Sequence, residues 1–290
     1  MLRNSIFFVI MTVLLSVMAA GCNSSSQKSQ VNGHKTAKQP ILIEGAMPIE
    51  VKDLVDKLKD VKKEKSGYFV FYKGKLDHYP VVVVRTGKGM ENAAAATAVA
   101  IERYNPRAII GQGTAGGHDP KLHVSDIVLG KRTVHIGSFK TEVKGDNEGI
   151  HPKKWKPMDL MASEGSGSNS DAEKIRYYQG DKKLLAAANA VKDKYTAGKV
   201  VEGTIGSADV WNSEIDRIQW FHKKYGTSAE EMEGFSEAQM ANEYHTPFLD
   251  IRVLSDNITN GGKYNPKTAG PLQAYVIKVV KQYISTQTNK

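Results

Sequence analysis

The sequence contains one cysteine in 290 residues, at position 22, so no intrachain disulfide bond can form. It contains no cluster of His, Asp and Glu at metal-ligand spacing, so we expect neither a metal ion nor any other cofactor. It also has no RNP, zinc-finger or helix-turn-helix signature. A net charge of +9 therefore does not predict a nucleic-acid partner, and the scattered lysines are typical of a solvated surface.

The chain begins with a positively charged end, followed by a continuous apolar run from Ile6 to Val17 and small residues up to Gly21. This pattern predicts a signal peptide over residues 1–21 that is not part of the fold. Together with Cys22 it resembles a bacterial lipoprotein box, although Ala19 stands where Leu is usual. The resemblance implies a lipid on Cys22 and an extracytoplasmic protein anchored to the cell membrane. The alternative is a plain secretory signal with an incidental cysteine.

Residues 22–40 are predicted to be a flexible tether between this cysteine and the folded domain. The segment is rich in Ser, Asn, Gln and Lys and contains almost nothing apolar. Such a segment cannot bury enough surface to offset the entropy that ordering costs. Its lysines favour the surface of an anionic bilayer.

From residue 41 to 290 strand patterns alternate with helix patterns, which predicts an α/β domain. We expect three layers, α/β/α, around a mixed, largely parallel, twisted sheet. The predicted strands are 41–46, 68–72, 79–85, 108–110, 126–129, 199–205 and 248–254, with a turn at 73–75. The predicted helices are 50–60, 91–104, 182–195, 213–225, 234–243 and 270–284.

The segment Lys131 to Gly180 is less regular than the rest of the domain. It contains Gly, Pro and Asn, and a Ser/Gly run from Ser163 to Ser170 that we interpret as mobile. A long loop of this kind within a compact domain is usually functional or mobile.

Two local patterns suggest a ligand site. The stretch Gly111 to Gly117 follows a strand, but it lacks both the Walker A ending and the acidic residue of a dinucleotide-binding unit, so it indicates either a ligand loop or a tight turn. Asp256 follows a buried strand, where open α/β sheets place their ligands. Alone, Asp256 is equally consistent with a catalytic acid and with a helix N-cap.

Five motifs in order resemble those of the 5′-methylthioadenosine/S-adenosylhomocysteine nucleosidases, which belong to the purine nucleoside phosphorylase superfamily. The resemblance extends over nearly all residues from Ile41 to Ile284. The motifs are Gly45-Ala46-Met47-Pro48-Ile49-Glu50; Thr86-Gly87-Lys88-Gly89; Gly113-Thr114-Ala115-Gly116-Gly117 with Val124-Ser125-Asp126-Ile127-Val128; Glu231-Met232-Glu233; and Arg252-Val253-Leu254-Ser255-Asp256.

This resemblance implies hydrolysis of the N-glycosidic bond of a purine nucleoside, with release of adenine and a ribose product. Glu50 matches the base that activates water, and Asp256 the acid at N7 of the purine. The remaining matches lie around the water, the ribose or the purine: Arg252, Thr86, Gly87, Met232, Glu233, Ser255 and, more loosely, Trp211.

The cleavage reaction requires two carboxyl groups with different roles. Cleavage places positive charge on the ribose and negative charge on the leaving purine, so a carboxylate must face the sugar and an acid must face the base. Burial must therefore raise the pKa of Asp256, while Glu50 must be ionised.

Some residues depart from the family or leave the assignment open. Glu44 and Asp250 occupy strand positions that are usually apolar in the family. Either water reaches these strand ends, or the two acids are paired with cations. We assign structural or surface roles to His118, His123 and His135. The resemblance also implies a homodimer. The alternative functions are a phosphate-dependent phosphorylase and an inactive, lipid-anchored nucleoside-binding protein.

Overall fold

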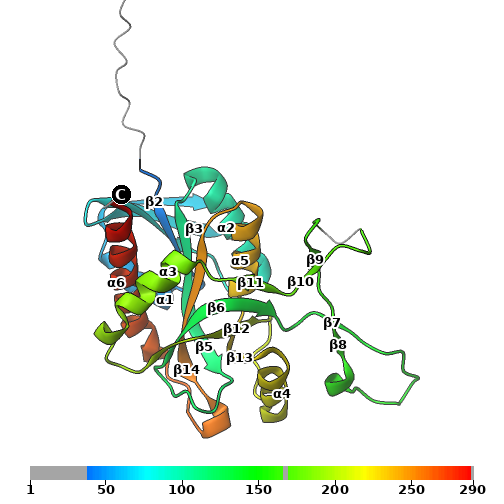
Figure 1. Ribbon diagram of the computed structural model, residues 1–290. Coiled ribbons are helices and arrows are strands. Elements are labelled where there is room, and N and C mark those ends of the chain that lie inside the picture. Colours follow the sequence, from blue (N-terminus) through cyan, green and yellow to red (C-terminus); the bar gives the residue numbers. More distant parts are fainter. Residues whose placement is uncertain (1–37, 166–168, 289–290) are drawn as a thin grey trace, which may run out of the picture. The chain divides into compact units, whose positions relative to one another are not determined.

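A mixed β-sheet forms the centre of the described structure, a computed structural model that covers residues 38–165 and 169–288 (Figure 1). Its main path is β11-β6-β12-β13-β5-β1-β4-β3-β2, and β14 pairs with both β5 and β6. Since β13 also pairs with β5, the strands β5, β14, β6, β12 and β13 close a ring. The strands of this sheet are β1 (Ile41–Gly45), β2 (Lys59–Ser66), β3 (Phe69–Leu76), β4 (Tyr79–Arg85), β5 (Ala108–Gly117), β6 (Ile127–His135), β11 (Tyr177–Gln179), β12 (Val200–Ser207), β13 (Thr227–Glu231) and β14 (Phe248–Asp256).

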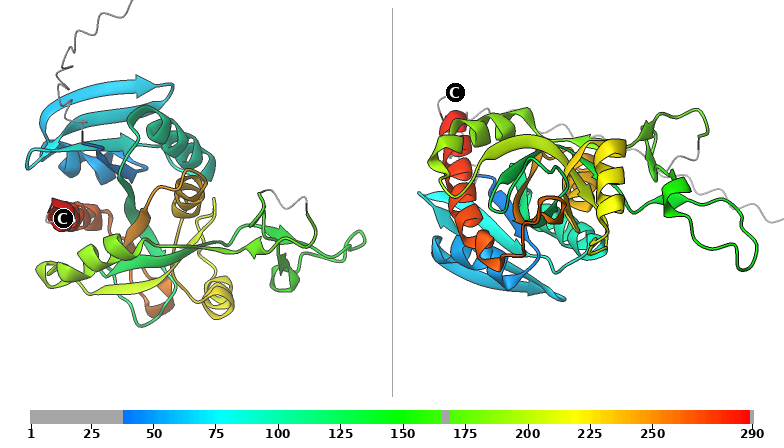
Figure 2. Two further views of the ribbon diagram at one scale, coloured as in Figure 1. Left: turned by 45° about the horizontal axis from the view of Figure 1, so that its top comes forward. Right: turned by 90° about the horizontal axis from the view of Figure 1, so that it is seen from below.

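Helices cover both faces of the sheet, which confirms the predicted three-layer α/β/α fold (Figures 1 and 2). One face packs against α1 (Pro48–Asp56), α3 (Lys182–Ala190) and α6 (Ala269–Thr288). The other packs against α2 (Met90–Tyr104) and α5 (Gly234–Glu243), while α4 (Ile215–Tyr225) packs beside β13. The short 3₁₀ helices are η1 (Pro152–Lys154), η2 (Lys192–Lys194), η3 (Ile258–Asn260) and η4 (Pro266–Thr268).

Strand β1 shows why the layers form. Ile41 and Ile43 point into the core beneath α1 and α6, and Leu42 points into the core beneath α2 and α5. All three are at most 1% exposed, so this strand is apolar on both faces, as a central strand covered by helices must be.

The predicted boundaries are wrong at the first helix, at the second strand and at the helix predicted over 182–195, because α3 ends at Ala190 and the 3₁₀ helix η2 follows it. Helix α1 ends at Asp56 instead of residue 60, because Lys59–Ser66 forms β2 at the edge of the sheet. Every residue of β2 is exposed or half-buried, so it lacks the apolar alternation that predicts a strand. Strand β3 continues through residues 73–75, and the chain turns instead at Asp77 and His78, which have positive φ values.

The stretch Gly111 to Gly117 is neither a loop nor a tight turn, because β5 runs through it and is paired on both edges. Its glycines leave room for side chains that pack against the strand. A Cβ atom at Gly111 would lie 2.0 Å from Oε2 of Glu237, and one at Gly117 would lie 2.5 Å from the side chain of Asn257.

The segment 131–180 leaves the sheet at the end of β6 and returns in β11, which pairs with β6 (Figures 1 and 2). Between them lie β7 (Phe139–Lys140), β8 (Lys156–Pro157), β9 (Met161–Ala162) and β10 (Lys174–Ile175). Contacts of Phe139 with Trp155 and Trp220 join this segment to α4. Of the Ser/Gly run interpreted as mobile, residues 166–168 lie outside the described residues.

The signal peptide, Cys22 and most of the tether, residues 1–37, also lie outside the described residues. Among the helices of residues 38–165 and 169–288, none combines the length and apolar character that crossing a membrane requires.

Candidate functional site

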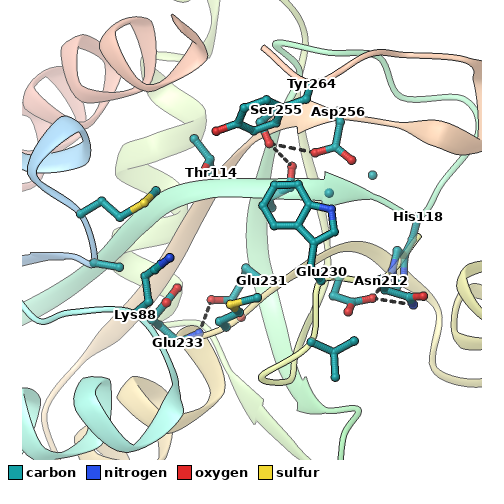
Figure 3. A pocket seen from close by; sticks show the side chains of 18 of the residues that line it. Lys88, Thr114, His118, Asn212, Glu230, Glu231, Glu233, Ser255, Asp256 and Tyr264 are labelled. Carbon is teal, nitrogen blue, oxygen red and sulfur yellow. Dashed lines mark hydrogen bonds and ion pairs between the residues drawn. The ribbon is translucent and has the colours of Figure 1, made fainter. Parts of the chain in front are cut away.

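A cavity of about 280 Å³ opens where β1, β5, β12, β13 and β14 end (Figure 3). Six of the predicted site residues line it: Glu50, Trp211, Met232, Glu233, Ser255 and Asp256. The lining also includes residues that the sequence did not single out as site residues, namely Ala46, Met47, Lys88, Thr114, Ala115, Gly116, Gly117, His118, Val210, Asn212, Ile218, Glu230, Glu231 and Tyr264.

Glu50 lies in the first turn of α1 and is 2% exposed. Its Oε2 accepts a hydrogen bond from the backbone N–H of Met47 at 3.0 Å, which also caps the helix. Its Oε1 accepts from the backbone N–H of Thr114 at 2.9 Å and from the Thr114 hydroxyl at 3.1 Å. The carboxylate is therefore held by both β5 and its own helix, and Thr114 is a positioning residue that sequence reasoning missed.

Arg252 is predicted beside the attacking water, but it lies in β14 behind the cavity wall and is 1% exposed. Its guanidinium contacts Asp250 at 2.7 Å, Glu231 at 2.8 Å and Glu233 at 3.1 Å. Burial opposes its charge, yet these carboxylates raise the pKa of Arg252 well above its usual value. The side chain thus acts on the cavity through Glu233, which lines it.

Glu233 lies where α5 begins and connects Arg252 to the turn after β4. Its Oε1 accepts from the backbone N–H of Gly89 at 3.0 Å, and its Oε2 accepts from Arg252. Burial raises the pKa of Glu233 to about 7, although Arg252 lowers it. Two charge-assisted contacts therefore hold this carboxyl group at the cavity.

Thr86 and Gly87, which the resemblance places near the water and the substrate, do not line the cavity. Thr86 is fully buried and its hydroxyl donates to the carbonyl oxygen of Gly87 at 2.9 Å. Positive φ values at Gly87 and Gly89 shape this turn, which presents the Gly89 N–H to Glu233. In this structure the motif positions a binding residue, and of its four residues Lys88 contributes to the cavity lining.

Asp256 ends β14 and lines the cavity together with Ser255. Burial, assisted by the nearby charge of Glu230, raises the pKa of Asp256, while the hydrogen bond from the Ser255 hydroxyl at 3.0 Å lowers it. The alternative of a helix cap is excluded for Asp256, because Asn257 is the N-cap of η3. A carboxyl group with a raised pKa beside a cavity is suited to donate a proton.

Trp211 lies at the mouth of the cavity. It is 66% exposed and meets Tyr264 edge to face, with ring centroids 5.6 Å apart. Both aromatic residues line the cavity, and Figure 3 shows Tyr264 on the same side of it as Asp256. It is therefore placed to cover a planar occupant.

Of the three histidines assigned structural or surface roles, His118 is buried and paired but also lines the cavity. His123 is exposed and lies beside Asn260, outside the cavity lining. His135 is half-buried against Phe235, with ring centroids 5.4 Å apart. Only His118 therefore belongs to the candidate site.

Glu44 and Asp250, the two acids that depart from the family pattern, are both fully buried, so water does not reach them. Asp250 is paired with Arg252. Glu44 has no cationic partner among the described residues; Thr97 donates a hydrogen bond to it at 2.9 Å, and burial raises its pKa to about 8. Glu237 lies close to both acids, and burial raises its pKa well above the usual value. Glu44 therefore retains its proton at neutral pH.

Within residues 38–165 and 169–288, no group of three or more His, Cys, Asp or Glu side chains is arranged to hold a metal ion. The cavity itself combines five carboxyl groups with Lys88 and His118.

Comparison with known proteins identifies relatives of this chain. A family model described as the phosphorylase superfamily matches residues 40–283. The 5′-methylthioadenosine/S-adenosylhomocysteine nucleosidase of Bacillus cytotoxicus is 31% identical over 221 residues, which cover 74% of this chain and 85% of the relative. The corresponding protein of Bacillus anthracis is 30% identical over the same shares.

Solved structures agree with this relationship. The nucleosidase of the same description from Colwellia psychrerythraea, in complex with adenine, is 28% identical with a TM-score of 0.67, covering 84% of this chain and 95% of that one. The nucleosidase from Neisseria meningitidis, in complex with methylthio-immucillin-A, is 25% identical with a TM-score of 0.66, covering 86% and 100%. Futalosine hydrolase of Helicobacter pylori, at 21% identity, 84% and 97% coverage and a TM-score of 0.68, shares the fold.

Proposed function

We propose, from the premise that this chain belongs to the phosphorylase superfamily, that it hydrolyses the N-glycosidic bond of a purine nucleoside. The observation that carries the proposal is one cavity lined by Glu50, Glu233 and Asp256, and Met232 also lines it. The sequence relatives support the nucleosidase reaction, and their names support substrates of the 5′-methylthioadenosine and S-adenosylhomocysteine type, with adenine as the released base.

Asp256 acts on the purine. As the bond to the ribose breaks, electrons move onto the base, and a proton delivered to N7 neutralises them. The raised pKa of Asp256, caused mainly by burial, retains that proton closer to neutral pH than an ordinary aspartic acid does. The Ser255 hydroxyl fixes the carboxyl group in place.

Glu50 and Glu233 act at the ribose. Glu50 accepts a proton from a water molecule, whose oxygen then forms the bond to the anomeric carbon. Glu233 accepts hydrogen bonds from the sugar hydroxyls, and its negative charge stabilises the positive charge that develops on the ribose. Arg252 keeps Glu233 oriented through their 3.1 Å contact.

Water is favoured over phosphate as the nucleophile. A phosphate would need cationic partners, and Arg252 is already engaged by four carboxyl groups, those of Glu231, Glu233, Glu237 and Asp250. Around the cavity the described residues supply Lys88 and His118 as possible cations, against the carboxyl groups of Glu50 and Glu233 on the ribose side. An incoming phosphate would be repelled by these carboxyl groups.

The test is release of free base from methylthioadenosine, adenosylhomocysteine, adenosine and inosine by the part of the chain from residue 38 onward. We expect phosphate-independent release, and a loss of about 10²- to 10⁴-fold in kcat for Asp256→Asn. Thermal unfolding of the variant controls for folding. Strict dependence on phosphate would identify a phosphorylase, absence of release a binding protein, and full activity of Asp256→Asn would refute the mechanism.

For the region outside the described residues, we propose that Cys22 carries the lipid that anchors the protein to the cell membrane on its extracytoplasmic side. The apolar run followed by small residues and a lone cysteine supports this proposal. Full-length protein should fractionate with membranes until detergent is added, and Cys22→Ser should abolish this. Equal membrane association of both forms would contradict the proposal.

We further propose a homodimer in solution. Exposed apolar side chains support an interface in this part of the chain, because exposed apolar surface is used for protein contacts: Val210 and Trp211 line the cavity, and Ile215 begins α4. Sedimentation analysis should give twice the mass of one chain, and a single-chain mass at micromolar concentration would refute the dimer.

A further inference from the structure

A group of polar side chains closes one end of the cavity and takes no part in the mechanism above. We call it the polar wall; it consists of His118 at the end of β5, Asn212 after β12 and Glu230 in β13. Figure 3 places all three away from Lys88 and Glu233. The polar wall therefore belongs to the end of the site where the base is bound.

The hydrogen bonds of the polar wall converge on one atom. Nε2 of His118 lies 2.7 Å from Oε2 of Glu230, and Nδ2 of Asn212 donates to the same Oε2 at 3.2 Å. The other ring nitrogen of His118 lies 2.7 Å from the hydroxyl of Thr227, and its ring stacks on Phe221. These contacts fix the Glu230 carboxylate in one orientation.

The second oxygen of this carboxylate is left for an occupant. Among the hydrogen bonds of the described residues, none reaches Oε1 of Glu230. Glu230 is 7% exposed and lines the cavity. Oε1 is not among the buried polar atoms that lack a partner, so it is open to the cavity and can accept a hydrogen bond from an occupant.

The base end of the cavity is therefore rich in acceptors. Asp256 donates its one proton to N7 of the purine, and its other oxygen can only accept. Oε1 of Glu230 is a second acceptor. Position 6 of a purine is the neighbour of N7, so the group at that position faces this acceptor-rich end.

We propose, on the basis of the function proposed above, that Glu230 determines base specificity by accepting an N–H from the 6-amino group of the purine. A 6-amino group carries two N–H bonds, which suit the two acceptors. A 6-oxo group presents only an acceptor oxygen at that position, which a carboxylate repels. His118 and Asn212 are positioning residues that hold Glu230 in the required orientation.

The experiment uses two nucleosides that differ only at position 6, 5′-methylthioadenosine and 5′-methylthioinosine. For the wild type, we expect kcat/KM to favour the 6-amino substrate by at least about 100-fold, because a 6-oxo substrate leaves the carboxylate unpaired. In Glu230→Gln this ratio should fall at least about tenfold, since the amide can turn an N–H toward the 6-oxo group.

Glu202→Gln is the matched control, because it makes the same change of charge at a residue outside the cavity lining. Its ratio should equal that of the wild type. An unchanged ratio in Glu230→Gln, or a wild type that cleaves both nucleosides equally well, would overturn the proposal.

A binding measurement covers the cases in which the variant does not fold or neither nucleoside is cleaved. Isothermal titration of the wild-type protein with adenine and with hypoxanthine should give at least about tenfold tighter binding of adenine. Equal affinities refute the role of Glu230. Selective adenine binding without cleavage of either nucleoside refutes the proposed hydrolysis and leaves the role of Glu230 supported.

Discussion

The buried Glu44 makes the stability of this protein depend on pH in a way that one substitution should reveal. Its side chain is fully buried in β1, beside Glu237, and Thr97 is its hydrogen-bond donor. Burial raises its pKa from 4.5 to about 8 in the folded state. In the unfolded chain the same group is exposed to water and releases its proton near pH 4.5.

The sign of the effect follows from these two values. Below about pH 4.5 the group is protonated in both states and does not affect the pH dependence. As the pH rises toward 8, the unfolded chain releases the proton while the folded protein retains it, so stability is lost. At about 1.4 kcal/mol per pKa unit, the loss between pH 5 and pH 8 is about 3 kcal/mol.

Glu44→Gln removes this titration and retains an oxygen for Thr97. Any cost in stability from its new amide N–H groups does not vary with pH. The free energy of unfolding of the variant, relative to that of the wild type, should therefore rise by about 3 kcal/mol from pH 5 to pH 8. Urea unfolding followed by tryptophan fluorescence at several pH values measures this difference.

The exposed Glu202→Gln is again the control and should follow the wild-type profile. Parallel profiles of the wild type and Glu44→Gln over the whole range would mean that Glu44 is not protonated in the folded protein. Another group would then have to neutralise the buried acids Glu44, Glu237 and Asp250.

Two further predictions concern β5 and the acid at the base. Gly111→Ala should lower the free energy of unfolding by about 1–3 kcal/mol, because the new Cβ would lie 2.0 Å from Glu237 Oε2; unchanged urea unfolding would show that the carboxyl group moves aside freely. The rate of base release should fall as the pH rises through the raised pKa of Asp256, because the acid then loses its proton; a pH–rate profile without an alkaline decline would assign the proton to another group.

Much of the fold could be predicted from local pattern. Strand β4 and helix α5 have the predicted bounds. In β4 the bounded run of β-branched residues from Val81 to Val84 is typical of a buried central strand. The edge strand β2 was missed because it has no buried face, and β13 was missed because it is short and contains Ser and Glu. Their hydrogen bonds to neighbouring strands determine these two elements, and those partners are distant in sequence.

The candidate site, like the fold, could be predicted only in part. Ordered motifs predicted Glu50, Met232, Glu233, Ser255 and Asp256, and all of them line one cavity. The motifs could not predict which oxygen each group would contact, since that depends on how the strands are placed side by side.

The sequence by itself determined the order of the five motifs along the chain, the alternation of strands and helices, and the residue types that glycosidic cleavage requires. Only the tertiary structure decided that Arg252 lies behind the wall and reaches the cavity through Glu233. It also decided that His118 and Glu230, 112 residues apart, form one pair. The physical reason is that burial and pairing set the charge and direction of a side chain, and both depend on contacts between strands that local sequence does not encode.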